Sequence, residues 1–284
     1  MKVFHFMKVL LLLISVSLVS CAATMPDVAY VTDGDPLQKL DLYLPEGESA
    51  EARPVLIAIH GGGWAIGDKG NPGFVHPKFG WFKQHDFIVA SINYRLSPAV
   101  SHPAHVEDVC EAIAWIGEHI AEHGGDPDRL YLIGHSAGAH LAALAAVDRD
   151  KLKAAGGDPE AIKGVILLDG AAYHVSRQIE AAGGGRMWIN AFTDDPATQR
   201  DASPTLKVAK FDATPPPFLI LHVATRPSST EQSEGLARAL GRKGGKATVV
   251  GIEGKNHMTI NRDLGKPGDP TTEAVAEFLR LKPE

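Results

Sequence analysis

The chain has 284 residues, of which 44% are hydrophobic and 22% charged, as is usual for a globular protein. Its net charge of −6, with no run of five or more lysines and arginines, argues against a nucleic-acid-binding surface. The sequence also lacks the cysteine and histidine spacing of a zinc site, so we expect no bound metal.

The first 20 residues have the pattern of an export signal. Lys2 and Lys8 come before an apolar stretch over residues 9–19, which is too short to span a bilayer comfortably and which ends in the run Leu18-Val19-Ser20-Cys21. This looks like a bacterial lipoprotein signal, in which Cys21 becomes the lipidated first residue of the mature chain. We therefore predict a signal peptide over residues 1–20 and a lipid anchor at Cys21, at the bacterial cell envelope. A secretory signal cleaved after Ala22 or Ala23, giving a soluble secreted or periplasmic protein, is the alternative.

Residues 21–284 alternate between strand-like and helical segments, which favours a single α/β domain with a mostly parallel, doubly wound sheet. In such sheets ligands bind beyond the carboxyl ends of the strands. The first two predicted strands form a hairpin. The predicted strands are 28–32, 40–43, 55–59, 87–92, 130–133, 164–168, 218–221 and 247–250.

A glycine cluster follows the predicted strand 55–59, in the run His60-Gly61-Gly62-Gly63-Trp64. Glycines leave backbone N–H groups uncovered, and such groups can bind the oxyanion that develops during acyl transfer. We expect Gly62 or Gly63 to supply one of these donors. A phosphate-binding loop is the alternative, but the glycine and lysine spacings of such loops are missing.

The run Gly134-His135-Ser136-Ala137-Gly138 lies between a short apolar segment at 129–133 and an alanine-rich helical segment. A serine between two glycines at such a turn is typical of a nucleophile elbow, which raises the serine hydroxyl above the sheet. The pattern predicts Ser136 as a nucleophile and the N–H of Ala137 as the second oxyanion donor. A glycine–serine turn without chemistry is the alternative.

A general base is predicted at His257, in the loop after the last predicted strand. In hydrolases with this chain order the histidine comes last, on that loop. A solvated loop histidine is the alternative.

Three segments together resemble the α/β-hydrolase esterases, in particular the hormone-sensitive-lipase-like and acetylxylan/feruloyl-esterase-like group. They are residues 54–69, which include Gly67-Asp68-Lys69, residues 125–138, and Lys255-Asn256-His257. The resemblance covers nearly everything after about residue 28. It implies an α/β-hydrolase fold and a serine carboxylesterase that needs no cofactor and acts on a small-molecule or polysaccharide-linked ester.

The acid that would orient His257 is missing from the place where this group usually carries it. After the predicted strand 218–221 the chain has Thr225 and Arg226 at that position. Asp169, at the end of the predicted strand 164–168, is our preferred substitute, and Glu231 is the alternative. The departure keeps a catalytically impaired binding protein open as an alternative function. A second alternative is an amidase of the arylformamidase type, which shares the His-Gly-Gly-Gly-Trp loop.

The segment from about residue 170 to 217 is too long for a plain connection and ends in three prolines. We predict that it forms a partial cap over the site and shapes the substrate pocket. Trp64 and Trp188 are predicted walls of that pocket, with a place in the core as the alternative.

Overall fold

The computed structural model describes residues 24–281, so the predicted signal peptide and Cys21 lie outside the described residues. Eight strands form one sheet in the order β1-β2-β4-β3-β5-β6-β7-β8. β1 and β2 pair antiparallel, β2 joins β4 antiparallel, and all further pairs are parallel. The strands are β1 Met25–Ala29, β2 Lys39–Tyr43, β3 Arg53–Ile59, β4 Ile88–Ile92, β5 Gly125–His135, β6 Ile162–Leu168, β7 Phe218–Val223 and β8 Ala247–Ile252.

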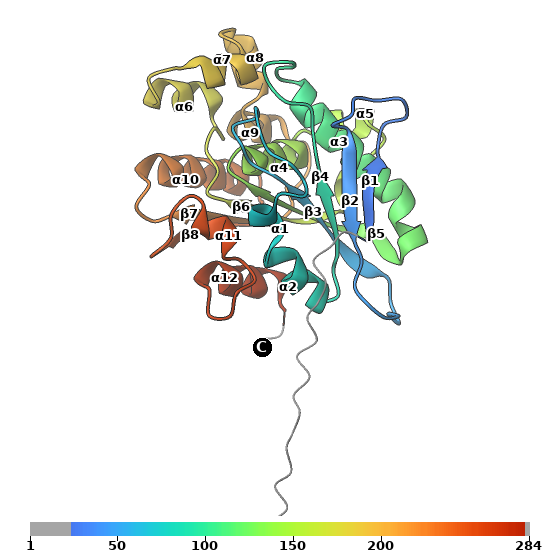
Figure 1. The fold of residues 1–284 in the computed structure, drawn as a ribbon. Helices are drawn as coiled ribbons and strands as arrows, with labels where there is room; N and C mark the ends of the chain where they lie inside the picture. The colour runs from blue at the N-terminus through green and yellow to red at the C-terminus, as the bar shows by residue number, and fades with distance from the viewer. Residues whose placement is uncertain (1–23, 282–284) are drawn as a thin grey trace, which may run out of the picture.

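Helices cover both faces of the sheet (Figure 1). Helices α3 (Ala104–His119), α4 (Ala137–Val147) and α10 (Pro227–Arg242) pack in the core on one face. Helices α2 (Lys78–Gln84) and α12 (Pro270–Leu279) pack in the core on the other. Both faces of the parallel strands are therefore buried, which explains why these strands read as continuous apolar runs. The predicted α/β-hydrolase fold, with its doubly wound and mostly parallel sheet, is confirmed.

The segment between β6 and β7 folds into short helices, of which α6, α7 and α8 lie together at the upper left in Figure 1. The loop after β4 holds this insertion: the His102 N–H donates to the Ala191 carbonyl at 2.7 Å, and the Ser97 hydroxyl donates to the Asn190 carbonyl at 3.2 Å. The helices of the insertion are α6 Val175–Ala181, α7 Arg186–Phe192, α8 Pro196–Asp201 and α9 Pro204–Lys207. The remaining helices are α1 Pro72–Val75, α5 Arg149–Ala154 and α11 Thr259–Arg262, with 3-10 turns at Ile120–His123, Pro159–Ala161 and Val208–Lys210.

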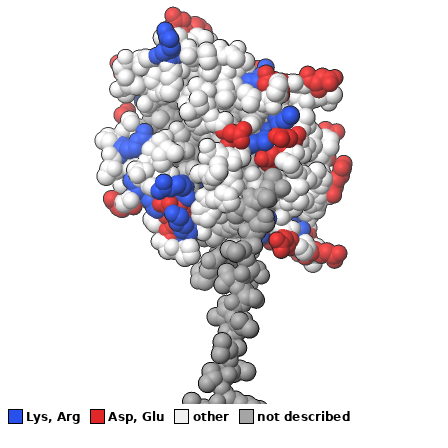
Figure 2. All heavy atoms as spheres, viewed as in Figure 1, with Lys and Arg blue, Asp and Glu red and all other residues white. Residues whose placement is uncertain are grey.

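Charged side chains are dispersed over the face shown in Figure 2, where basic groups lie in small clusters beside acidic ones. Lys255 forms ion pairs with both Asp263 and Asp269. Between residues 24 and 281 no helix is both long and apolar enough to cross a bilayer.

Candidate active site

Ser136 occupies a sharp turn between β5 and α4. Its φ of 56° and ψ of −119° lie in a region that non-glycine residues seldom adopt, as expected for a nucleophile elbow. The turn packs closely against the end of β3, where a Cβ at Gly138 would stand 2.1 Å from the Ile59 carbonyl oxygen. Glycine is therefore required at position 138 by close backbone approach.

The structure brings Ser136, His257 and Asp169 together. The Ser136 Oγ lies 3.0 Å from His257 Nε2, and His257 Nδ1 lies 2.7 Å from Asp169 Oδ2. Ser136 follows β5, Asp169 follows β6, and His257 lies in the loop after β8, so all three come from the carboxyl ends of parallel strands. With Nδ1 donating to the carboxylate, Nε2 is free to accept the serine proton, which is the arrangement of a serine hydrolase triad.

Asp169 is buried, and its carboxylate accepts hydrogen bonds at both oxygens. Oδ1 receives the Val223 N–H at 3.0 Å and the Ser229 hydroxyl at 2.7 Å. Burial by itself would raise the pKa of Asp169, but the bonds from His257, Val223 and Ser229 and the charge of Arg226 outweigh it and hold the pKa well below its usual range. The carboxylate is ionised at neutral pH.

The other three residues considered for the acid position do not take that place. Glu231 is exposed within α10, and among residues 24–281 the hydrogen bonds of the His257 ring go to other partners. Thr225 is exposed in the loop after β7. Arg226 turns inward instead, and its Nη1 contacts Asp169 Oδ2. Sequence reasoning missed this contact because a cation at the position gives no local signal of the carboxylate that it meets.

The glycine loop that follows β3 presents the expected backbone donors. Among residues 24–281, the N–H groups of Gly62 and Gly63 donate to no other group, and the Ala137 N–H lies in the first turn of α4, where helices have no internal acceptor. Gly62 has a φ of +114°, and a Cβ there would stand 1.9 Å from the Ile66 carbonyl oxygen. The tight turn therefore depends on glycine at position 62.

The Gly67-Asp68-Lys69 run holds the far end of this loop. Asp68 accepts from the Asn93 side chain at 2.9 Å, and the Lys69 N–H donates to the Asn93 side-chain oxygen at 2.7 Å. The Lys69 ammonium lies 2.8 Å from both Asp27 and Asp41 on the first two strands. These residues act on the loop and not on the serine.

Trp64 and Trp188 are not walls of the cavity at Ser136, as the sequence had suggested. Both indoles are buried, 5.5 Å apart, and they pack with Phe192. The Trp64 Nε1–H donates to His140 Nδ1 at 3.3 Å, and His140 Nε2–H donates to the Ala202 carbonyl at 2.7 Å. The two indoles therefore pack in the core, where they join the glycine loop to the insertion.

The cavity at Ser136 has a volume of about 370 Å³. Its apolar lining includes Ile66, Phe74 and Met258, and its polar lining includes Asp68 and Asn261. None of the residues from 170 to 217 lines this cavity, although the Met187 sulfur approaches Gly63. The predicted cap therefore borders the glycine loop and does not line the cavity at Ser136.

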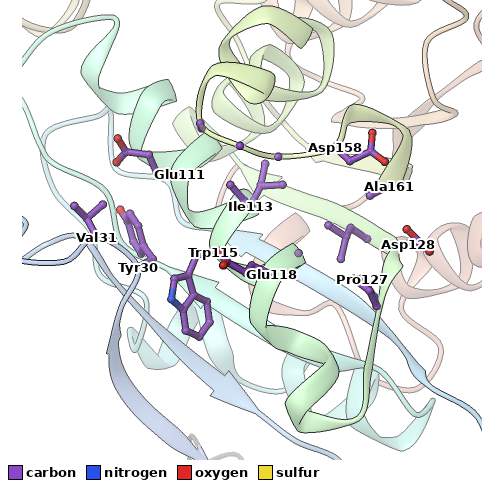
Figure 3. Close-up of a pocket in the computed structure, with 16 residues that line it drawn as sticks. Tyr30, Val31, Glu111, Ile113, Trp115, Glu118, Pro127, Asp128, Asp158 and Ala161 are labelled. Atoms are coloured by element: carbon purple, nitrogen blue, oxygen red, sulfur yellow. The ribbon is translucent and has the colours of Figure 1, made fainter.

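A larger cavity, of about 660 Å³, lies elsewhere, between α3, the first half of β5 and the loops after β1 and α5 (Figure 3). Tyr30 and Trp115 lie beside it, with the carboxylates of Glu111, Glu118 and Asp158. Ser136, Asp169 and His257 are not among the residues that line it. Size alone therefore does not identify the reactive centre.

Two further features bear on cofactors and on the base. Within the described part of the chain, no three histidine, cysteine, aspartate or glutamate side chains are grouped to hold a metal ion, and Cys110 is a buried free thiol. His135, beside the elbow, donates its Nε2–H to the His257 carbonyl at 2.6 Å. Burial, and then the nearby His257, lower the pKa of His135 to about 3, so this ring is neutral and serves to hold the base loop.

Proteins similar in sequence to this chain are named as esterases. A probable isoprenylcysteine alpha-carbonyl methylesterase of Arabidopsis thaliana is 34% identical over 79% of this chain and 49% of its own length. The esterase LipQ of Mycobacterium tuberculosis is 33% identical over 91% of this chain and 62% of its own length. The chain thus spans about half to three fifths of the length of these relatives.

Comparison with solved structures agrees on the fold. A propionate-bound thermophilic esterase of Thermogutta terrifontis has a TM-score of 0.71 at 25% identity, covering 92% of this chain and 96% of its own. Esterase B of Lactobacillus rhamnosis, at 24% identity and a TM-score of 0.75, covers 90% of this chain and 84% of its own.

The family model BD-FAE matches residues 40–240, which contain the glycine loop, the elbow and Asp169. By that match and by its fold, the chain belongs to the BD-FAE family of α/β-hydrolases.

Proposed function

We propose that this protein is a serine carboxylesterase that works through an acyl-enzyme intermediate. The observation that carries the proposal is the unbroken chain of contacts from Ser136 Oγ through His257 to the buried Asp169 carboxylate. The esterase names of the relatives support the same reaction class. The acid that the sequence lacked at its usual position is available from β6, which weakens the case for an impaired binding protein.

In the proposed reaction Ser136 Oγ attacks the ester carbonyl carbon while His257 Nε2 takes its proton. The carbonyl oxygen becomes an oxyanion, which the N–H groups of Gly62, Gly63 and Ala137 would bind. His257 then gives the proton to the leaving alcohol oxygen. Water, deprotonated by the same ring, attacks the acyl-enzyme and releases the acid, so that Ser136 regains its proton.

The cavity favours esters with one compact apolar group. A volume of about 370 Å³ beside Ile66, Phe74 and Met258 suits a short acyl chain or one aromatic ring, and Asp68 and Asn261 could meet a hydroxyl. We propose short-chain, aryl or sugar esters as the substrate class, free or linked to a polysaccharide. Propionate, which is bound in the Thermogutta terrifontis esterase structure, is a short-chain carboxylic acid.

Covalent labelling tests the proposal. A fluorophosphonate should add one phosphonyl group to Ser136, seen by intact mass and peptide mapping, and Ser136→Ala should neither be labelled nor hydrolyse p-nitrophenyl acetate. A panel of formyl-aryl amides run beside the acetyl esters distinguishes an arylformamidase-type amidase. Absence of labelling in the folded wild-type protein would instead support a binding protein.

We further propose that a lipid on Cys21 holds the mature protein at the bacterial cell envelope. The support is the Leu18-Val19-Ser20-Cys21 run after the apolar stretch. Cys21→Ser should release the protein from the membrane fraction or stop its processing. A soluble mature chain that starts after Ala23, shown by fractionation and intact mass, would contradict the anchor.

A further inference from the structure

Arg226 reaches the proposed triad from the start of α10. Its Nη1 contacts Asp169 Oδ2 and lies 2.7 Å from His257 Nδ1. The Arg226 side chain is 36% exposed, whereas that of Asp169 is fully buried. A fixed positive charge therefore lies beside the contact between His257 and Asp169.

The contacts at Asp169 Oδ2 determine where the His257 proton lies. The 2.7 Å contact between His257 Nδ1 and Asp169 Oδ2 requires a proton on Nδ1, because an unprotonated nitrogen would meet the carboxylate lone pair to lone pair. The Arg226 guanidinium, which only donates, directs a second proton to the same oxygen. The proton on Nδ1 fixes the ring in the tautomer whose Nε2 can accept the Ser136 proton. Arg226 also places a cation beside the ring that becomes an imidazolium during the reaction, and the cation offsets part of the stabilisation that the carboxylate gives.

We propose that Arg226 is a positioning residue that sets the acid limit of the reaction, by keeping Asp169 ionised and by opposing protonation of His257. The inference rests on the proposed esterase function. Without Arg226 the ring would be protonated, and so lost as a base, at a higher pH. With Arg226 the protein remains active in more acidic surroundings.

The other titratable groups near His257 do not contact its ring as Asp169 and Arg226 do. His135 faces the ring from the end of β5, with ring centroids 4.6 Å apart, and is neutral because burial lowers its pKa. Lys78, on α2, is buried, and burial lowers its pKa to about 7. Lys255, two residues before the base, is paired with two aspartates. Among residues 24–281, only Asp169 and Arg226 place a charged atom within hydrogen-bonding distance of the His257 ring.

The test compares four variants by two measurements. Arg226→Met and Arg226→Gln remove the charge, Arg226→Lys keeps it, and Arg242→Met removes an exposed charge at the far end of the same helix. The first measurement is the titration of the His257 ring by NMR, with its signal identified by its loss in His257→Asn. The second is the pH profile of kcat/KM for p-nitrophenyl acetate.

In Arg226→Met and Arg226→Gln we expect the ring titration and the acid limb of the profile to move up together by about one pH unit, a tenfold change in the protonation equilibrium. Arg226→Lys and Arg242→Met should stay within a few tenths of the wild type. Folded charge-removing variants that titrate as the wild type does would overturn the inference, as would an equal shift in Arg226→Lys. The NMR titration needs no turnover, so a wild-type protein without ester hydrolysis contradicts the proposed function and leaves the role of Arg226 to be decided separately.

Discussion

The backbone N–H of Ser136 donates to the carbonyl oxygen of Leu168 at 3.0 Å, so the predicted nucleophile is bonded directly to the residue that precedes the predicted acid. Asp169 in turn donates its own N–H to Leu221 on β7 at 2.7 Å. Both residues have positive φ, 56° for Ser136 and 45° for Asp169. The sheet therefore continues its hydrogen bonding one residue beyond the strands and holds two strained residues in register.

Replacing Asp169 by asparagine tests the acid. Asn keeps the volume but removes the charge that orients and stabilises the His257 imidazolium, so kcat should fall by about 10²- to 10⁴-fold. The melting temperature should also fall, because Arg226 loses the carboxylate that it contacts. The measurements are steady-state kinetics and thermal unfolding of the same preparations.

Glu231→Gln is the matched control, since Glu231 is an exposed carboxylate on the neighbouring helix. We expect its kcat to stay within twofold of the wild type. A large loss in Glu231→Gln with little loss in Asp169→Asn would transfer the role to Glu231.

A methyl group at Gly62 tests the oxyanion loop. In Gly62→Ala the new Cβ would clash with the Ile66 carbonyl, so the loop must shift and the donors with it. We expect kcat to fall by about 10²- to 10³-fold, the usual effect of losing one oxyanion donor. Gly47→Ala is the control for the backbone conformation, because Gly47 also has positive φ (+79°) but open space around it. It should cost about 1 kcal/mol of stability and leave kcat unchanged. Equal kinetics in the two variants would place the oxyanion site elsewhere.

Lys78 predicts a pH-dependent stability. It is fully buried, and burial lowers its pKa from 10.5 to about 7, although its Nζ meets Asn261 Oδ1 at 2.5 Å and the face of Phe74 at 4.1 Å. Between these two pH values the unfolded chain binds a proton that the folded chain does not, so the wild type loses stability as the pH falls from 10.5 towards 7. Lys78→Met abolishes this dependence.

We therefore expect Lys78→Met to be more stable than the wild type, by an amount that grows by about 3 kcal/mol between pH 9.5 and pH 7. Urea unfolding across this range gives the measurement. Lys163→Met, on the exposed side of β6, is the control and should show a difference that does not vary with pH. A difference for Lys78→Met that is equally constant would mean that the folded protein holds this lysine charged.

Met258 tests the predicted preference for a compact apolar group. It lines the cavity beside His257 and is 59% exposed. Met258→Ser should lower kcat/KM for p-nitrophenyl hexanoate by about three- to tenfold, the loss of about 1 kcal/mol of apolar contact. The rate for the acetate should hardly change. Ile189→Ser, at an equally exposed position that does not line the cavity, should change neither. Parallel losses for both esters would mean that Met258 supports the base loop and not the substrate.

The fold was predictable from sequence where the local residue pattern matches the burial and the backbone contacts of the segment in the folded protein. Val55 and its neighbours are apolar on both sides because both faces of β3 are covered, and the glycines at 134 and 138 are required by backbone contact. Strand β5 begins at Gly125, five residues before the predicted start, because Gly125 pairs with Arg53 although three charged residues and a proline intervene. Tertiary pairing there overrides local propensity.

The contacts that sequence could not predict are those between distant side chains. Nothing near Arg226 indicates that it meets a carboxylate 57 positions earlier in the chain. Trp64 follows the glycine loop directly, and this suggested a pocket wall, but its direction is set by Phe192 and His140. A side chain's chemistry can be read from one position, whereas its direction depends on neighbours that only the fold supplies.

The hydrogen bonds from Trp64 through His140 to Ala202 have a consequence for how such proteins diversify. They connect the oxyanion loop, the helix behind the serine and the insertion, so the insertion is not a detachable module. A relative that exchanged this segment for another would also have to exchange the residues that meet the indole. Evolution of the insertion and of the loop is therefore coupled, and grafting experiments should transfer both together.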